Sequence, residues 1–276
     1  MTSSMAIALD SAALLQLRGA DALGFAQAQF TQDLRTLAVG KQGWSAWLDA
    51  QGRARAVFAL LRTEPDTLLL WWPQGDAHQL ATDLRRYVLR SRLVIEVLQG
   101  WQLLPGDPTN LPPAGMLAPQ NGGWALRLPD TTTPRGVVLA PAGLPLDADA
   151  QRDWQRADLA ARLPWIRPAT AGQFTPQALG LEQIEAIAFA KGCYPGQEIA
   201  ARLHFRGGNK RGLAVVATGA FCCAPGAPLI DDSGTTRGTV LYGSAPDPAT
   251  PALALAVVAL EAIDSALHPA PDASTA

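Results

Sequence analysis

The stretch Lys191-Gly192-Cys193-Tyr194-Pro195-Gly196-Gln197-Glu198 places a cysteine directly before a tight turn. Proline fixes φ at the second position of the turn 194–197 and glycine accepts a positive φ at the third, which predicts a type II turn. Helical spacing of the apolar residues that follow predicts a short helix after the turn. Cys193 would then lie near a helix N-terminus and close to Lys191, and both features favour a thiolate.

The same residues also permit a plainer interpretation. Free cysteines are often buried and serve only to fill space, so Cys193 could be a packing residue. We expect that packing role for Cys222 and Cys223, which begin a predicted strand or turn. Lys191 is one of three lysines among 22 lysines and arginines. This usage either marks a site that needs a compact ammonium or reflects chance and solvation.

The composition describes a globular chain. The 276 residues are 48% hydrophobic and 17% charged, which leaves room for two or three domains. A net charge of −2 argues against a dedicated nucleic-acid-binding protein, although a local basic patch is compatible with it. Three cysteines without CxxC spacing favour a reducing compartment and no metal site made by this chain alone. We see no signal-peptide pattern and no membrane-spanning run, so we expect a cytoplasmic protein.

The periodicity predicts mixed α and β structure, followed by a region that is all β. Asp21 and Asp76 precede helical patterns as N-caps, and glycine in the segment 49–52 predicts a hairpin. Prolines break residues 99–147 into short strands and loops. Further helices are expected at 149–163 and 181–189. Strands are expected at 13–17, 44–48, 54–61, 67–72, 93–98, 213–218, 235–242 and 252–260, the last three of which suggest a small barrel.

The residues around Cys193 carry a family resemblance. The stretch 191–198, with Ala201-Arg202 and the segment 205–211 after it, resembles the signature of the YgfZ family. The segments 172–177 and 30–34 also match the pattern of that family. The resemblance extends over residues 10–260.

The resemblance implies an α+β fold like that of the glycine-cleavage T-protein, an aminomethyltransferase. It implies three domains around a central folate pocket, with a small C-terminal β-barrel. The division that we expect is an N-terminal mixed α/β domain at 1–98, a central α/β folate-pocket domain that carries the Cys193 motif at 99–207, the barrel at 208–264 and a tail at 265–276.

The resemblance also implies a function. The chain would bind tetrahydrofolate or a derivative and assist assembly or repair of iron–sulfur clusters in client enzymes, with an indirect effect on tRNA thiolation. A working thiolate would lie at the rim of the pocket. The expected partners are folate and client enzymes, without stable nucleic-acid or membrane contact. The implied catalytic residues are Cys193 and Lys191, and the implied cofactor-binding residues are Trp154, Gln173, Tyr194, Gln197, Glu198, Arg202 and Lys210.

Several of these residues have a second interpretation. Trp154 could stack on a folate ring or could simply belong to the core. The basic residues of 202–211 could contact the glutamate tail of folate, an acidic client surface or RNA, or could form an ordinary solvated face. Near Ala12 we find no second aromatic residue, although some members of the family have one there.

Two other functions remain as alternatives. A folate-dependent aminomethyl or one-carbon transferase would resemble the T-protein, which places carboxylates just after its first hairpin glycine. Here the segment 52–57 contains no acid, so a proton-handling carboxylate is missing. The other alternative is a non-catalytic scaffold in which folate is only structural.

Overall fold

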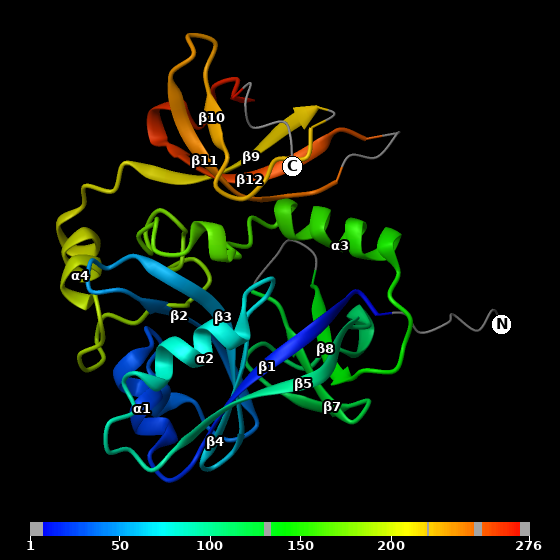
Figure 1. The fold of residues 1–276 in the computed structure, drawn as a ribbon, viewed down its shortest axis with the longest axis vertical. Helices are drawn as coiled ribbons and strands as arrows, with labels where there is room; N and C mark the ends of the chain where they lie inside the picture. The colour runs from blue at the N-terminus through cyan, green and yellow to red at the C-terminus, as the bar shows by residue number, and fades with distance from the viewer. Residues whose placement is uncertain (1–7, 130–133, 220, 246–249, 271–276) are drawn as a thin grey trace.

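Two curled antiparallel sheets with helix α3 (Ala148–Ala160) between them form the molecule (Figure 1). The computed structural model describes residues 8–129, 134–219, 221–245 and 250–270. The larger sheet has the strand order β2-β3-β4-β1-β5-β8-β7-β6. Its strands are β1 (Asp10–Arg18), β2 (Lys41–Leu48), β3 (Ala54–Glu64), β4 (Thr67–Trp71), β5 (Val94–Pro105), β6 (Ala118–Gln120), β7 (Gly123–Arg127) and β8 (Gly136–Pro141).

The central strands β3 and β4 of the larger sheet are buried on both faces, which explains their long apolar runs. Successive side chains of a strand point to opposite faces. Leu60 and Leu61 of β3 are both fully buried and belong to different cores. One core contains residues of α1 (Ala22–Gln29) and α2 (Ala77–Arg85), while the other contains α3, residues 163–194 and part of the C-terminal sheet.

The smaller sheet stands where the sequence predicts a barrel. Its order is β13-β10-β11-β12-β9, with β9 (Arg211–Gly219), β10 (Pro228–Ile230), β11 (Thr236–Gly243), β12 (Ala252–Ala259) and β13 (His268–Pro269). The Tyr242 hydroxyl donates to the carbonyl of Leu163 at 2.8 Å and ties this sheet to the larger core. Strand β13 lies in the expected tail and pairs with β10, while residues 271–276 lie outside the described residues.

The predicted N-terminal strands and most of the predicted helices are confirmed. One strand is longer than predicted, and one of the two predicted helix caps is not formed. Strand β5 does not stop at residue 98 but continues to Pro105, across the expected domain boundary. The Asp76 carboxylate caps α2 by accepting the N–H of Gln79. Asp21 precedes α1 as predicted, but its carboxylate accepts the backbone N–H of Arg92 instead of capping the helix.

The predicted helix at 181–189 is wrong. This segment forms turns, and Glu185 has a φ of 53°. The buried Thr31 hydroxyl donates to the carbonyl of Ala186 at 2.6 Å, and the N–H of Ala188 donates to the Thr31 carbonyl at 2.9 Å. Hydrogen bonds to a distant part of the chain therefore replace the helical ones that the local pattern favours.

Candidate functional site

Cys193 lies directly before the predicted type II turn, which the structure confirms. The N–H of Gln197 donates to the carbonyl of Tyr194 at 3.2 Å, and Gly196 has φ 74° and ψ 2°. Helix α4 (Gln197–Arg206) begins there. Because the Cys193 side chain is exposed, the turn presents the thiol to solvent beside the first turn of the helix.

Two glycines fit this turn against the β2–β3 hairpin. A Cβ at Gly196 would lie 2.4 Å from the carbonyl oxygen of Asp49 and 2.6 Å from the Cα of Gly52. A Cβ at Gly52 would lie 2.9 Å from the Cβ of Ile199. Both glycines have positive φ, at 74° and 72°. The close approach therefore requires glycine at both positions, and the hairpin fixes where Cys193 stands.

Lys191 lies inside the protein and anchors this loop. The residue is 6% exposed, and its Nζ donates to the backbone carbonyls of Gln27, Phe30 and Gln32. An ammonium group has three N–H donors, so these carbonyls use all of them. No donor remains for the sulfur of Cys193, in contrast to the thiolate partner that the sequence suggests. Burial lowers the pKa of Lys191 to about 8.

The other predicted residues of the motif divide between interior and surface. Tyr194 is buried, its hydroxyl donates to a backbone carbonyl at 3.4 Å, and burial raises its pKa to about 12. The side-chain amide of Gln197 donates to the carbonyl of Lys191 at 3.4 Å. Glu198 and Arg202 are exposed on α4. The first two side chains therefore hold the loop, while the last two face solvent.

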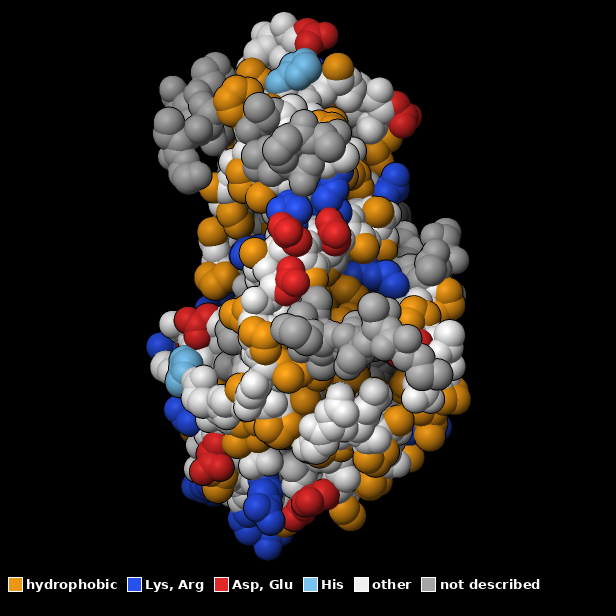
Figure 2. Space-filling model, turned by 90° about the vertical axis from the view of Figure 1, so that its right-hand side faces the viewer, with side chains coloured by type: hydrophobic (Ala, Val, Ile, Leu, Met, Phe, Trp, Pro, Cys, Tyr) orange, Lys and Arg blue, Asp and Glu red, His pale blue; other side chains and the backbone are white. Residues whose placement is uncertain are grey.

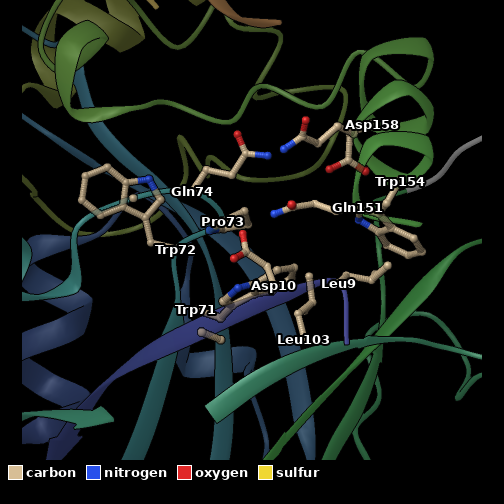
Figure 3. Close-up of a pocket in the computed structure, with 13 residues that line it drawn as sticks. Leu9, Asp10, Trp71, Trp72, Pro73, Gln74, Leu103, Gln151, Trp154 and Asp158 are labelled. Atoms are coloured by element: carbon tan, nitrogen blue, oxygen red, sulfur yellow. The ribbon is translucent and has the colours of Figure 1, made fainter. Parts of the chain in front are cut away.

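A cavity of about 260 Å³ lies at α3, between this helix, the start of β1 and the turn after β4. Trp154 lines it, as predicted for a cofactor-binding residue. Figure 3 shows the carboxylates of Asp10 and Asp158 and the amides of Gln74 and Gln151 directed toward one space. These groups come from elements that are far apart in the sequence, so the tertiary fold creates the cavity.

The wall of the cavity is rich in hydrogen-bond acceptors. Gln74 has a φ of 59°, a backbone conformation that is costly outside glycine. Its amide oxygen is buried and has no partner among the described residues. Carboxylate oxygens accept hydrogen bonds as well. The cavity therefore suits a ligand that presents several N–H groups.

A buried ion pair supports this wall from α3. Asp158 is 4% exposed, contacts Arg135 at 2.8 Å and accepts the indole N–H of Trp165 at 2.8 Å. Burial raises the pKa of Asp158, while Arg135 and the indole bond act in the opposite direction. The guanidinium of Arg135 also lies 4.0 Å from the ring centroid of Trp154. One face of this indole is therefore already covered.

Gln173 and Lys210 lie elsewhere, at a groove between residues 173–178 and 208–211. The predicted cofactor-binding residues are thus divided among the cavity, the Cys193 turn and this groove. Cys193 is not among the described residues that line the cavity or the groove. The thiol therefore does not line the Trp154 cavity, and its place at the rim of a folate pocket stays a prediction.

Sequence reasoning missed most of the polar residues of the cavity. On α3, Gln151, Trp154 and Asp158 follow one another at helical spacing and share a face, which is a signal that could have been used. Asp10 and Gln74 carry no such signal, since only the fold brings them to α3.

Within the described ranges, no group of three or more His, Cys, Asp or Glu side chains could hold a metal ion. The helices in this part of the chain are also too short or too polar to cross a membrane.

Comparison with known proteins gives relatives over most of the chain. No family model matches it. The chain is 32% identical over 216 residues to an uncharacterized protein of Haemophilus influenzae, which covers 77% of this chain and 73% of that protein. It is 32% identical over 229 residues to the tRNA-modifying protein YgfZ of Yersinia pestis, and 29% identical over 228 residues to that of Serratia proteamaculans. Each of these two matches covers 75% of this chain and 69% of the relative.

One solved structure shows the same fold. The glycine cleavage system aminomethyltransferase T of Bartonella henselae superposes with a TM-score of 0.67 at 18% sequence identity. The match covers 93% of this chain and 78% of that chain. At this identity the likeness describes the fold. It confirms the expected T-protein-like fold, which here consists of two curled sheets with mostly β content.

Proposed function

Because this chain belongs to the YgfZ family, we propose that it is a tetrahydrofolate-binding accessory protein for iron–sulfur client enzymes. It supports assembly or repair of their clusters in the cytoplasm, and its effect on tRNA thiolation passes through clients that thiolate tRNA. A reduced folate, when bound, supplies one-carbon or redox chemistry that amino-acid side chains lack.

The observation that carries the folate proposal is the acceptor-rich cavity at α3. The reduced pterin of folate contains a planar aminopyrimidinone ring and presents several N–H donors. Asp10, Asp158 and the partnerless oxygen of Gln74 would accept these donors, and Trp154 would pack beside the rings. A cavity with an apolar aromatic part and a few convergent polar groups is typical of small-ligand sites.

Titration calorimetry with tetrahydrofolate, under anaerobic reducing conditions, tests this site. We expect specific binding that Trp154→Ala weakens by about tenfold, which corresponds to about 1.4 kcal/mol of lost packing. Trp124→Ala is the matched control, because this half-buried tryptophan stacks on Trp101 and does not line the cavity. Equal weakening by both variants, or no binding by the wild type, would reject the folate proposal.

Cys193 is the working thiol in this proposal. An exposed thiol on a rigid turn can reach the surface of a client, and a thiolate can ligate iron, carry sulfur or exchange with another thiol. The interlocked glycines hold the turn in place, and the anchor at Lys191 fixes the loop that precedes it. Lys191 therefore acts on the thiol by positioning its loop.

The thiol is tested in cells that lack this protein, by measuring the activity of iron–sulfur clients and the level of thiolated tRNA. We expect Cys193→Ala to fail to restore either one. Cys222→Ala is the matched control, since this cysteine is also exposed, and it should restore both. If Cys193→Ala also restores both, the thiol is not required, and the non-catalytic scaffold becomes the better hypothesis.

The geometry of the hairpin does not favour aminomethyl transfer. Its tip carries one carboxylate, Asp49, and one oxygen of this group accepts the backbone N–H groups of Gln51 and Arg53 at 3.0 and 2.9 Å. That carboxylate closes the turn and the segment 52–57 offers no other. Formation of methylene-tetrahydrofolate from an aminomethyl donor would restore the transferase alternative.

A further inference from the structure

The segment between α2 and β5 concentrates exposed apolar side chains. Ten large hydrophobic side chains are exposed among the described residues, and three of them belong to this segment: Tyr87 at 48%, Leu89 at 88% and Val94 at 58%. Residues 85–94 also contain four arginines and no acid. Figure 1 shows the segment at the lower edge of the molecule, away from the smaller sheet. This edge therefore combines apolar surface with positive charge.

Three contacts hold this segment as a closed loop. The guanidinium of Arg85 donates to the backbone carbonyl of Ile95 at 2.6 Å, which joins the two ends of the loop. The backbone N–H of Arg92 donates to the carboxylate of Asp21 at 2.7 Å. The side chain of Leu93 packs against the core that contains residues of α1 and α2. The loop is therefore ordered before any partner binds, and its exposed side chains lie close to one another.

Most of the positive charge of the loop is available to a partner. Arg90 is exposed, and within the ranges that the structure describes its side chain forms no hydrogen bond or ion pair. Arg86 and Arg92 each contact one carboxylate, at 3.4 and 3.5 Å, and their side chains remain 71% and 80% exposed. Charges are more evenly mixed elsewhere. On the face shown in Figure 2, cationic side chains at the narrow middle of the molecule lie beside acidic ones.

The types of side chain in the loop favour a lipid surface over a nucleic acid or a protein. Leu89 and Val94 are the most exposed of its apolar residues, and neither has a planar ring on which a base could stack. Leucine and valine are also rare among the residues that dominate binding between proteins. Aliphatic side chains beside arginines and a tyrosine are, in contrast, typical of segments that lie at the boundary between lipid headgroups and acyl chains.

We propose that the loop 86–94 binds the surface of an anionic phospholipid bilayer. Leu89 and Val94 enter the boundary between headgroups and acyl chains, while the arginines contact the lipid phosphates. One loop of this size supports a reversible contact, because stable anchoring needs a second signal. The proposal is compatible with the expectation of no stable membrane contact, and it depends on neither the folate site nor Cys193.

Co-sedimentation with vesicles tests this contact, without folate in the assay. One set of vesicles contains phosphatidylcholine alone, and the other contains phosphatidylcholine with phosphatidylglycerol. We expect the wild type to bind the anionic vesicles alone, Leu89→Ser to weaken this binding by about tenfold, and Arg90→Gln to weaken it by about fivefold. The matched controls are Leu146→Ser and Arg211→Gln, which change an exposed leucine and an exposed arginine outside the loop and should bind like the wild type.

Three results would overturn the proposal. The first is no binding of the wild type to anionic vesicles, or equal weakening by the loop variants and their controls. The second is weakening by Arg90→Gln but not by Leu89→Ser, because the attraction would then be electrostatic alone, without insertion of the loop. The third is tighter binding of single-stranded oligouridylate than of anionic vesicles, lost in Arg90→Gln, which would assign the loop to nucleic acid instead.

Discussion

The Cys193 turn and the Trp154 cavity are built in opposite ways. The turn is specified by neighbouring residues, exposes its thiol and is held by a close backbone contact with the hairpin and by the buried Lys191 side chain. The cavity is assembled from β1, the turn after β4 and α3, and its wall contains a buried ion pair. We conclude that changes at the cavity should reduce stability. A change of the thiol itself should leave stability nearly unchanged.

The largest expected effect is at Asp158. Asp158→Ala removes one partner of the buried pair and leaves the charge of Arg135 and the indole N–H of Trp165 without their acceptor. We expect the free energy of unfolding to fall by about 3–5 kcal/mol, measured by urea denaturation. Asp149→Ala, on the same helix, removes an exposed partner of Arg152 and should cost far less. Similar losses for both variants would contradict the role of the buried pair.

The next effect concerns the glycine contact between the turn and the hairpin. Gly196→Ala combines a positive φ with a backbone clash, so we expect a loss of about 2–4 kcal/mol in the free energy of unfolding. Gly40→Ala has a positive φ of 79° but open space, and should cost about 1 kcal/mol.

Gly192→Ala completes this series, because Gly192 has neither a positive φ nor a close neighbour. Its free energy of unfolding should stay within about 0.5 kcal/mol of the wild type. The order of the three losses is the critical result. If Gly196→Ala costs no more than Gly40→Ala, the hairpin does not fix the turn.

The sequence predicts the turn better than the cavity for a physical reason. Pro195 and Gly196 determine the backbone locally, so the turn and the start of α4 could be predicted without the fold. The two strands around Gly52 have the same local origin. Asp10 and Gln74 reach the cavity only through strand pairing, and the segment 181–189 bonds to Thr31 instead of forming a helix. Lys191 could be noticed as unusual, but its carbonyl partners lie more than a hundred residues earlier in the chain.

A third prediction uses the buried anchor of the turn. Burial lowers the pKa of Lys191 to about 8 in the folded protein, whereas the ordinary value is 10.5. Between these pH values the unfolded chain holds a proton that the folded protein has released, so the stability that Lys191 contributes rises with pH. Over the full interval between these two pKa values, the free energy of unfolding should rise by about 3 kcal/mol.

The measurement compares the wild type with Lys191→Met from pH 7 to pH 11. We expect the stability difference between the two proteins to grow in favour of the wild type as the pH rises. Lys41→Met, which removes an exposed lysine, is the matched control. Parallel curves for wild type and Lys191→Met would show that the ammonium is not desolvated.

The smallest stability effect is expected at Cys193 itself. The side chain is exposed, so Cys193→Ser should change the free energy of unfolding by less than about 0.5 kcal/mol. The accessibility of each cysteine is measured by alkylation with iodoacetamide followed by mass spectrometry. Cys193 and Cys222 should be labelled in the native protein, whereas Cys223 is buried, its pKa is raised by that burial, and it should be labelled only after unfolding. Protection of Cys193 in the native protein would mean that the thiol packs like Cys223. The contrast between an exposed turn and a cavity with a buried ion pair would then be lost.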